Sequence, residues 1–390
     1  MSTTPDTETL VLGGGFAGRA LALALTGGAR AAEAPGQSDS DAVTVVDRGA
    51  PRSSDAPLAL LNPLAGRSLA PPNHTWVAYR HARNWLRAHA PPAALCFVGP
   101  ALRLMTDAAR ERRLRRSYAR AAPHYPSDIH HDWPNFEHLR AQRPWLPASH
   151  GVFRYGPAYA VRLPAVGEAL VAKLAAAGAA MVSQTGIALE RMGAHWRVHT
   201  NGGSVSARHV VLSLGDASPQ WLPGAPLRVF GGALARFERR PDVHLDAILT
   251  GSGHIAPMQD GTWVAGGTYW TPEQRPASSE EMHRAVRAHA SKLLPDLVAA
   301  RPLGVWQGWR LVCHPDRQPL VGPVPGHPNL WLFTAFGAKA LLFVPYLAEL
   351  LAAEMRQATT RIPAWARPEG RISAEHLALQ AAARSHRSPR

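Results

Sequence analysis

Residues 9–26 constrain the fold of this chain more than any other stretch. Residues 10–12 (Leu-Val-Leu) are typical of a buried strand, and an Ala- and Leu-rich segment that favours a helix follows the glycines. Between them, Gly13, Gly15 and Gly18 have the spacing G-x-G-x-x-G. In a strand–turn–helix unit, such glycines permit a tight turn, let the backbone approach a pyrophosphate and let the helix pack close to the strand. The free N–H groups of the helix N-terminus attract the same anion. The stretch therefore predicts a dinucleotide site, against the plainer interpretation of a glycine-rich loop.

A second strand that ends in an acid completes this pattern. Residues 43–46 (Val-Thr-Val-Val) favour a strand, and Asp47 follows them. A carboxylate in this place accepts hydrogen bonds from the ribose hydroxyls of adenosine. The separation from the glycines exceeds the usual ~20 residues, and a polar surface loop at 27–41 accounts for the excess. Asp47 would repel a ribose 2′-phosphate, which argues against NADP, although the adjacent Arg48 leaves that question open.

Composition places the chain among globular proteins. It has 390 residues, 46% of them apolar, and 12 tryptophans, which is enough for a large core and two domains. No long uncharged apolar stretch occurs, so we expect no membrane-spanning helix. Acidic Asp6 and Glu8 precede the first apolar run, which argues against a signal peptide, and we expect a cytoplasmic location. Cys96 and Cys313 fit a reducing compartment and form no metal-ligand pattern, so no metal site is expected.

The charge is strongly basic, with a formal net charge of +14. Residues 110–116 (Arg-Glu-Arg-Arg-Leu-Arg-Arg), with Arg103 and Arg120 nearby, predict a basic helix face. Residues 384–390 add three arginines in what we expect to be a flexible basic tail. Such charge fits either a solvated arginine-rich surface or an anionic partner such as nucleic acid. Charge alone favours the solvated surface.

The rest of the chain alternates helical and strand-like segments. A strand, a glycine-containing turn and a helix recur at residues 330–357, so we expect both chain ends to form one nucleotide-binding domain around a β-rich middle. Residues 57–72 and 121–150 predict irregular structure. We expect helices at about 76–89, 107–120, 164–178, 278–294 and 341–357, and strands at 94–104, 151–162, 180–183, 186–192, 196–200, 209–214, 230–238, 247–250, 255–259, 262–267 and 330–334.

Four ordered segments resemble the FAD-dependent oxidoreductases of the D-amino-acid oxidase and glycine oxidase superfamily. Residues 10–18 are similar to the FAD pyrophosphate loop, and Asp47-Arg48 to the acid after the second strand. Residues 210–218 (Val-Val-Leu-Ser-Leu-Gly-Asp-Ala-Ser) resemble a third FAD contact. Residues 308–346 resemble the closing signature, which contains G-x-R, then D-x-x-P-x-x-G, then a strand–glycine–helix unit. This closing segment is the most specific of the four.

The resemblance implies an α/β fold with a Rossmann-like FAD-binding domain around a central parallel sheet, and a substrate domain with a mainly antiparallel sheet. We expect residues 1–90, 160–225 and 305–390 in the first domain and 91–159 and 226–304 in the second. The FAD would be non-covalent, because no cysteine matches the position of the covalent link in sarcosine-oxidase relatives. The residues implied for FAD binding are Gly13, Gly15, Phe16, Ala17, Gly18, Asp47, Arg48, Gly215, Gly337, Ala338, Lys339 and Ala340.

The same resemblance implies oxidation of a C–N bond in a small amine or amino acid, with hydride transfer to flavin N5. Arg310 would bind the substrate carboxylate, unless it pairs with Asp316 or another acid instead. Tyr269 would line the substrate pocket, or else be an ordinary strand aromatic. Lys339 would face the flavin N1 region, or else be solvated while the backbone of residues 337–340 stabilises the reduced anion.

Two other functions stay open. Residues 62–67 and 337–340 are similar to the oxidase half of the bifunctional enzyme that matures the wobble uridine of tRNA, so a tRNA substrate is an alternative. The methyltransferase half is absent, and the basic cluster lacks the interleaved aromatics of an RNA-binding groove. The third hypothesis is an FAD-binding subunit that needs a partner for turnover. The sequence fixes neither the substrate, nor the electron acceptor, nor the oligomeric state.

Overall fold

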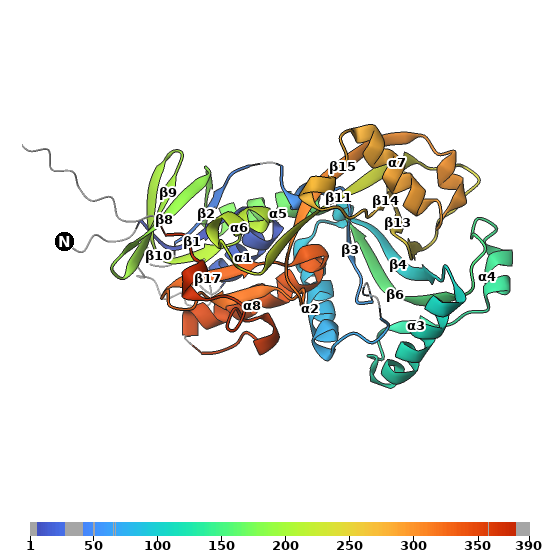
Figure 1. The fold of residues 1–390 in the computed structure, drawn as a ribbon, viewed down its shortest axis with the longest axis horizontal. Coiled ribbons are helices and arrows are strands. Elements are labelled where there is room, and N and C mark those ends of the chain that lie inside the picture. Colours follow the sequence, from blue (N-terminus) through green and yellow to red (C-terminus); the bar gives the residue numbers. More distant parts are fainter. Residues whose placement is uncertain are drawn as a thin grey trace, which may run out of the picture.

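The structure is a computed structural model, and it describes residues 6–27, 42–49, 51–64, 66, 68–357 and 359–379. Most of the expected loop at 27–41 and the expected tail at 384–390 lie outside these residues. The described chain forms two sheets that lie side by side, with helices packed on both (Figure 1). None of the helices in these residues is both long enough and apolar enough to cross a membrane.

The first sheet is Rossmann-like, as the N-terminal motif predicts. Its described centre is parallel, in the order β7-β2-β1-β10-β17, and β16 pairs antiparallel with β17 at one edge. A hairpin of β8 and β9 extends β10. The strands are β1 (Thr7–Leu12), β2 (Val43–Asp47), β7 (Ala180–Ser183), β8 (Gly186–Met192), β9 (His195–Thr200), β10 (Gly203–Leu212), β16 (Leu320–Pro323) and β17 (Leu330–Thr334).

The second sheet is antiparallel apart from the parallel pair β12 and β4. Its order is β15-β11-β14-β13-β12-β4-β6-β3, and β5 pairs with β6. The strands are β3 (Ala59–Leu61), β4 (Leu95–Leu104), β5 (His130–Asp132), β6 (Val152–Val161), β11 (Leu227–Glu238), β12 (Ile248–Thr250), β13 (His254–Pro257), β14 (Thr262–Gly266) and β15 (Pro302–Cys313). The fold class predicted from the sequence is therefore confirmed.

Helices cover the apolar faces of both sheets. Helix α1 packs against α5 and α8, and α2 packs against α8 (Figure 1). Apolar side chains of these helices join those of β1 and β2 in one buried core, because a parallel sheet buries both of its faces. The helices are α1 (Phe16–Gly27), α2 (Asn73–His89), α3 (Ala108–Ala121), α4 (Phe136–Gln142), α5 (Leu163–Ala176), α6 (Ser218–Trp221), α7 (Ser279–Ala290) and α8 (Ala340–Gln357).

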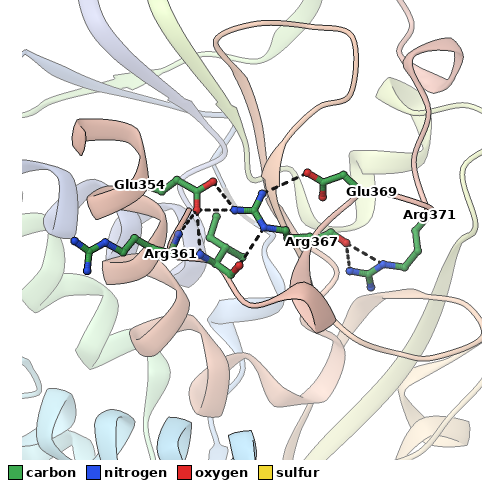
Figure 2. Close-up of polar contacts among 6 residues, drawn as sticks. Glu354, Arg361, Arg367, Glu369 and Arg371 are labelled. Atoms are coloured by element: carbon green, nitrogen blue, oxygen red, sulfur yellow. Dashed lines mark hydrogen bonds and ion pairs between the residues drawn. The ribbon is translucent and has the colours of Figure 1, made fainter. Parts of the chain in front are cut away.

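The segment after α8 is fastened to that helix by a buried carboxylate (Figure 2). Glu354, near the end of α8, accepts two hydrogen bonds from the Arg367 guanidinium, at 2.7 and 2.8 Å. It also accepts the backbone N–H groups of Arg361 and Ile362 at 2.7 and 3.0 Å. The side chains of Glu354 and Arg367 are only 8% and 16% exposed, so this ion pair is shielded from water. Arg371 extends the cluster to Asp316, at 3.3 Å.

Several elements differ from the sequence expectations. Residues 57–72 contain the short strand β3, which we expected to be irregular, and residues 121–150 contain β5 and α4. Helix α7 ends at Ala290, four residues before the expected end at 294. Strands β15 and β16 were not predicted. The domain boundary expected near residue 305 falls inside β15, a strand of the second sheet, so our division into two domains remains a proposal.

Candidate cofactor and substrate site

The glycine loop lies between the end of β1 and the start of α1. Gly13 has a φ of 116°, which L side chains rarely adopt, and a Cβ there would overlap the carbonyl oxygen of Ser213 at the end of β10. A Cβ at Gly18 would overlap the carbonyl oxygen of Gly13 and lie 3.3 Å from the Val11 side chain. The glycines thus bring α1 against the strand, and the N-terminus of α1 faces the space above the loop.

Asp47 lies at the end of β2, beside this loop. Its side chain forms an ion pair with Arg52, with Nε donating to Oδ1 at 3.2 Å and Nη2 donating to Oδ2. Arg19 of α1 lies 3.8 Å from the same carboxylate. Burial raises the pKa of Asp47, but the hydrogen bond and charge of Arg52, a backbone N–H at Gly49 and the charge of Arg19 together lower it further, so its net pKa lies below the usual value. Neither Arg19 nor Arg52 was predicted as a site residue from the sequence.

Arg48 points away from Asp47. Its guanidinium pairs with Asp216 at 3.1 Å, which joins the end of β2 to the turn after β10. That turn contains Gly215, with a φ of 55°. Arg19 and Arg52 thus pair with Asp47, and Arg48 pairs with Asp216. Both acids also line the cavity that is described next.

One cavity of about 560 Å³ brings most of the predicted residues together. It runs from the glycine loop past the ends of β2 and β10 to the N-terminal turn of α8, and then to the face of the second sheet. The predicted residues on its wall are Gly13, Gly15, Phe16, Ala17, Asp47, Arg48, Gly215, Tyr269, Arg310, Gly337, Ala338 and Ala340.

Two predicted residues and both cysteines lie outside this wall. Gly18 lies beneath the loop, where it acts through helix packing. Lys339 is not among the wall residues, and its ammonium lies 5.8 Å from the centre of the Phe343 ring, so its role near the flavin stays a prediction. Cys313 is buried in the core beside the first sheet, and Cys96 is likewise absent from the cavity wall.

Arg310 marks the other end of the cavity. Its Nη2 donates to the carbonyl oxygens of Gly231 and Thr268, at 2.9 and 2.7 Å. Its Cζ lies 3.9 Å from the centre of the Tyr269 ring, a cation–π contact. The expected alternative partner Asp316 pairs with Arg371 instead, and Arg310 has no acidic partner among the residues that the structure describes. Burial lowers the pKa of this guanidinium, which nevertheless stays charged.

His254 is a site residue that the sequence analysis missed. It begins β13 and lines the cavity next to the backbone of Gly266 and Gly267. Burial, with a smaller contribution from the charge of Arg310, lowers its pKa to about 4, so the imidazole is neutral near pH 7. A single histidine in a β-rich segment carries no motif, so no pattern in the sequence could have identified it.

The residues present fit FAD. A side chain at Gly13 or Gly14 would fill the space beside the loop, since a Cβ at Gly14 would lie 2.6 Å from the Cγ of Asp47. The buried hydroxyl of Ser213, at the carboxyl end of β10, has no hydrogen-bond partner among the described residues, and Ser213 lines the cavity. A pyrophosphate at the loop, a ribose near Asp47 and a further polar group at Ser213 would satisfy these features.

Comparison with curated proteins finds two kinds of relative. The bifunctional protein MnmC of tRNA 5-methylaminomethyl-2-thiouridine biosynthesis, from Paracidovorax citrulli, is 32% identical over 188 residues, covering 41% of this chain and 29% of that protein. A glycine oxidase from Pseudomonas aeruginosa is 29% identical over 183 residues, covering 45% of this chain and 49% of that protein. The matched regions thus span about half or less of these relatives.

Structure comparison and a family model cover nearly the whole chain. The crystal structure of glycine oxidase from Geobacillus kaustophilus superposes with a TM-score of 0.78 over 96% of this chain and all of that chain, at 18% identity, so it shows the shared fold. The family model described as DAO, FAD dependent oxidoreductase, matches residues 8–354. The resemblance inferred from four segments is therefore confirmed, and this chain belongs to the DAO family of FAD-dependent oxidoreductases.

Proposed function

We propose that this enzyme oxidises the C–N bond of a small amine that also carries a carboxylate, that is, an amino acid. The observation that carries the proposal is Arg310. Its buried guanidinium has no acidic partner among the described residues and lies in the same cavity as the dinucleotide loop. An unpaired buried charge is costly, so a substrate carboxylate that completes the ion pair would bind strongly here.

The surrounding groups would orient this substrate. Two backbone carbonyls fix the Nη2 of Arg310, while Nη1 and Nε keep N–H groups without a partner among the described residues. Tyr269 covers the guanidinium, and the neutral His254 adds a polar group without a second positive charge. Leu234 and Trp306 contribute apolar wall, which excludes water from the reacting carbon.

The oxidation of the substrate balances with bound FAD as the two-electron oxidant. Bound FAD supplies a two-electron acceptor at flavin N5. The carbon that bears the nitrogen loses a hydride and the nitrogen loses a proton, which gives an imine. Water then adds to the imine, and the C–N bond breaks to yield a carbonyl compound and a free amine. A second substrate, oxygen or another acceptor, would return the cofactor to its oxidised form.

Anaerobic bleaching of the flavin absorption tests the proposal. Glycine and sarcosine should bleach the purified protein, whereas methylamine and dimethylamine, which lack the carboxylate, should not. Arg310→Met should raise the substrate concentration for half-maximal bleaching at least ~100-fold, because it removes a charge-assisted hydrogen bond in a buried site. Bleaching by no amino acid would overturn the proposal. Bleaching that needs an added protein would favour the FAD-binding subunit instead.

A tRNA substrate is the second candidate, favoured by the 32% identity to the MnmC protein over 188 residues. Helix α3 places Arg112, Arg113 and Arg116 on its exposed side, and none has an ion-pair partner among the described residues. Binding of unmodified tRNA that weakens steeply with salt would support this candidate. Equal binding by a variant with these three arginines changed to glutamine would count against it.

A further inference from the structure

We propose that the substrate carries a second carboxylate, which Arg317 receives at the surface just beyond the cavity. This inference rests on the proposed function, because it places the first carboxylate at Arg310. It names a narrower substrate class: secondary amines and amino acids with two carboxylates.

The first observation is the register of β11 and β15. Phe230 lies directly opposite Arg310 in this antiparallel pair, and Gly232 lies opposite Gly308. Opposed residues in an antiparallel pair project from the same face, and so do residues two apart on one strand. Gly232, Gly308 and Arg310 line the cavity, so Phe230 extends the same face beyond its wall.

The second observation is a row of alternating cations and rings along this face. The Cζ of Arg310 lies 3.9 Å from the Tyr269 ring centre, and the rings of Tyr269 and Phe230 lie 6.1 Å apart. The Cζ of Arg317 lies 5.9 Å from the Phe230 ring centre. Tyr269 is 56% exposed and Arg317 is exposed as well, so the row leads from the buried guanidinium to the surface.

The third observation is that positive charge at this end has no counter-charge. Arg317 has no ion-pair partner among the described residues, because the adjacent Asp316 faces Arg371. Lys339 lies close enough for the charge of Arg317 to lower its pKa, after the larger effect of burial, and it too lacks an acidic partner in the described chain. Water solvates the exposed Arg317 in the free enzyme, so a monocarboxylate substrate gains nothing from it, whereas a dicarboxylate that reaches both ends of the row would gain a second charge-assisted contact.

Two amines that differ by one carboxylate test the inference: sarcosine, which is N-methylglycine, and iminodiacetate, which is N-carboxymethylglycine. Arg317→Gln should raise the KM for iminodiacetate about tenfold and change the KM for sarcosine less than twofold. Arg228→Gln is the matched control, since Arg228 is exposed on the same strand and the same face as Phe230 but makes no cation–π contact with the row among the described residues. It should change neither KM.

The outcomes separate the two proposals. Equal effects of Arg317→Gln on the two substrates, or none, would overturn the dicarboxylate inference while the proposed function stands. If neither amine is oxidised, the two KM values give no comparison, and the proposed function fails only if no other amino acid bleaches the flavin either. In that case, binding of glutarate and of butyrate, followed as a perturbation of the flavin spectrum, decides whether a second anion site exists. Preference for glutarate that is lost in Arg317→Gln would support the second anion site, and equal affinities would reject it.

Discussion

Replacing Gly14 by alanine should weaken FAD binding without preventing folding. The backbone of Gly14 is not in the positive-φ region, so alanine is compatible with its conformation. The added Cβ would lie 2.6 Å from the Cβ and Cγ of Asp47 and 2.8 Å from its Oδ2. Real Cβ atoms essentially never approach a neighbour closer than 3.0 Å, so Asp47 must retreat by about 0.4 Å. It cannot swing away freely, because Arg52 holds both of its carboxylate oxygens.

The magnitude follows from the cost of overpacking. Inserting a methyl group into a packed site costs about 1–3 kcal/mol, and this corresponds to about 5- to 150-fold weaker FAD binding if the retreat of Asp47 spoils its contact with the ribose. The assay is titration of the apoprotein with FAD, followed by flavin fluorescence. Gly27→Ala, at the end of α1, is the control, since its Cβ would meet nothing within 4 Å. Equal FAD affinities of the two variants would refute the placement of Asp47 at the ribose.

Three further predictions concern charged groups. Glu354→Ala should lower the free energy of unfolding by about 3 kcal/mol in urea titrations, whereas the exposed neighbour Glu369→Ala should change it little. Burial raises the pKa of Glu354, but backbone N–H groups and Arg367 lower it further, so its stabilisation is present above pH about 4.5 and is lost as the pH falls through the lower folded value. Arg52→Met should cost about 2 kcal/mol in the same titration, and an unchanged midpoint would contradict a role in holding Asp47. The pKa of His254 is lowered to about 4 in the folded protein, so the unfolded chain binds a proton more readily, and the free energy of unfolding falls as the pH drops from about 6.5 toward 4. His254→Asn should therefore reduce the loss of melting temperature over this pH range in thermal melts.

The sequence predicted the elements that have local signals. The glycine spacing and the apolar run at residues 10–12 located β1 and α1, because both signals lie within one short stretch. The helix predicted at 341–357 is α8, which runs from Ala340 to Gln357, and it was predicted despite Pro345 because its apolar pattern continues through the proline. Strand β3 was missed since it has only three residues directly before the turn-forming Asn62-Pro63, and pairing with β6 rather than local propensity stabilises it.

Family motifs supplied most of the residues that line the cavity, whereas residues that only the fold brings to it carry no signal in the sequence, and the roles predicted for the motif residues stay predictions. Arg52 follows Asp47 by five positions, yet nothing in the sequence indicates that its guanidinium forms an ion pair with that carboxylate. His254 and Arg310 are 56 positions apart and meet because β13 and β15 belong to one sheet. Lys339 belongs to the matching motif, and its ammonium lies 5.8 Å from the Phe343 ring centre, a contact that the motif does not indicate.

The pairing of β11 with β15 explains why the Arg310 end of the cavity lies on the second sheet. A side chain at Gly232 would overlap the Arg310 guanidinium, so the absence of one leaves the space that this guanidinium occupies. From there its Nη2 reaches the carbonyls of Gly231 and Thr268, and these contacts fix its position without consuming an acidic group. Had an aspartate fixed Arg310 instead, the charge would already be neutralised and a carboxylate would gain little by binding. A guanidinium held by carbonyls keeps its full charge for the ligand, which is the arrangement that recognition of an anionic substrate requires.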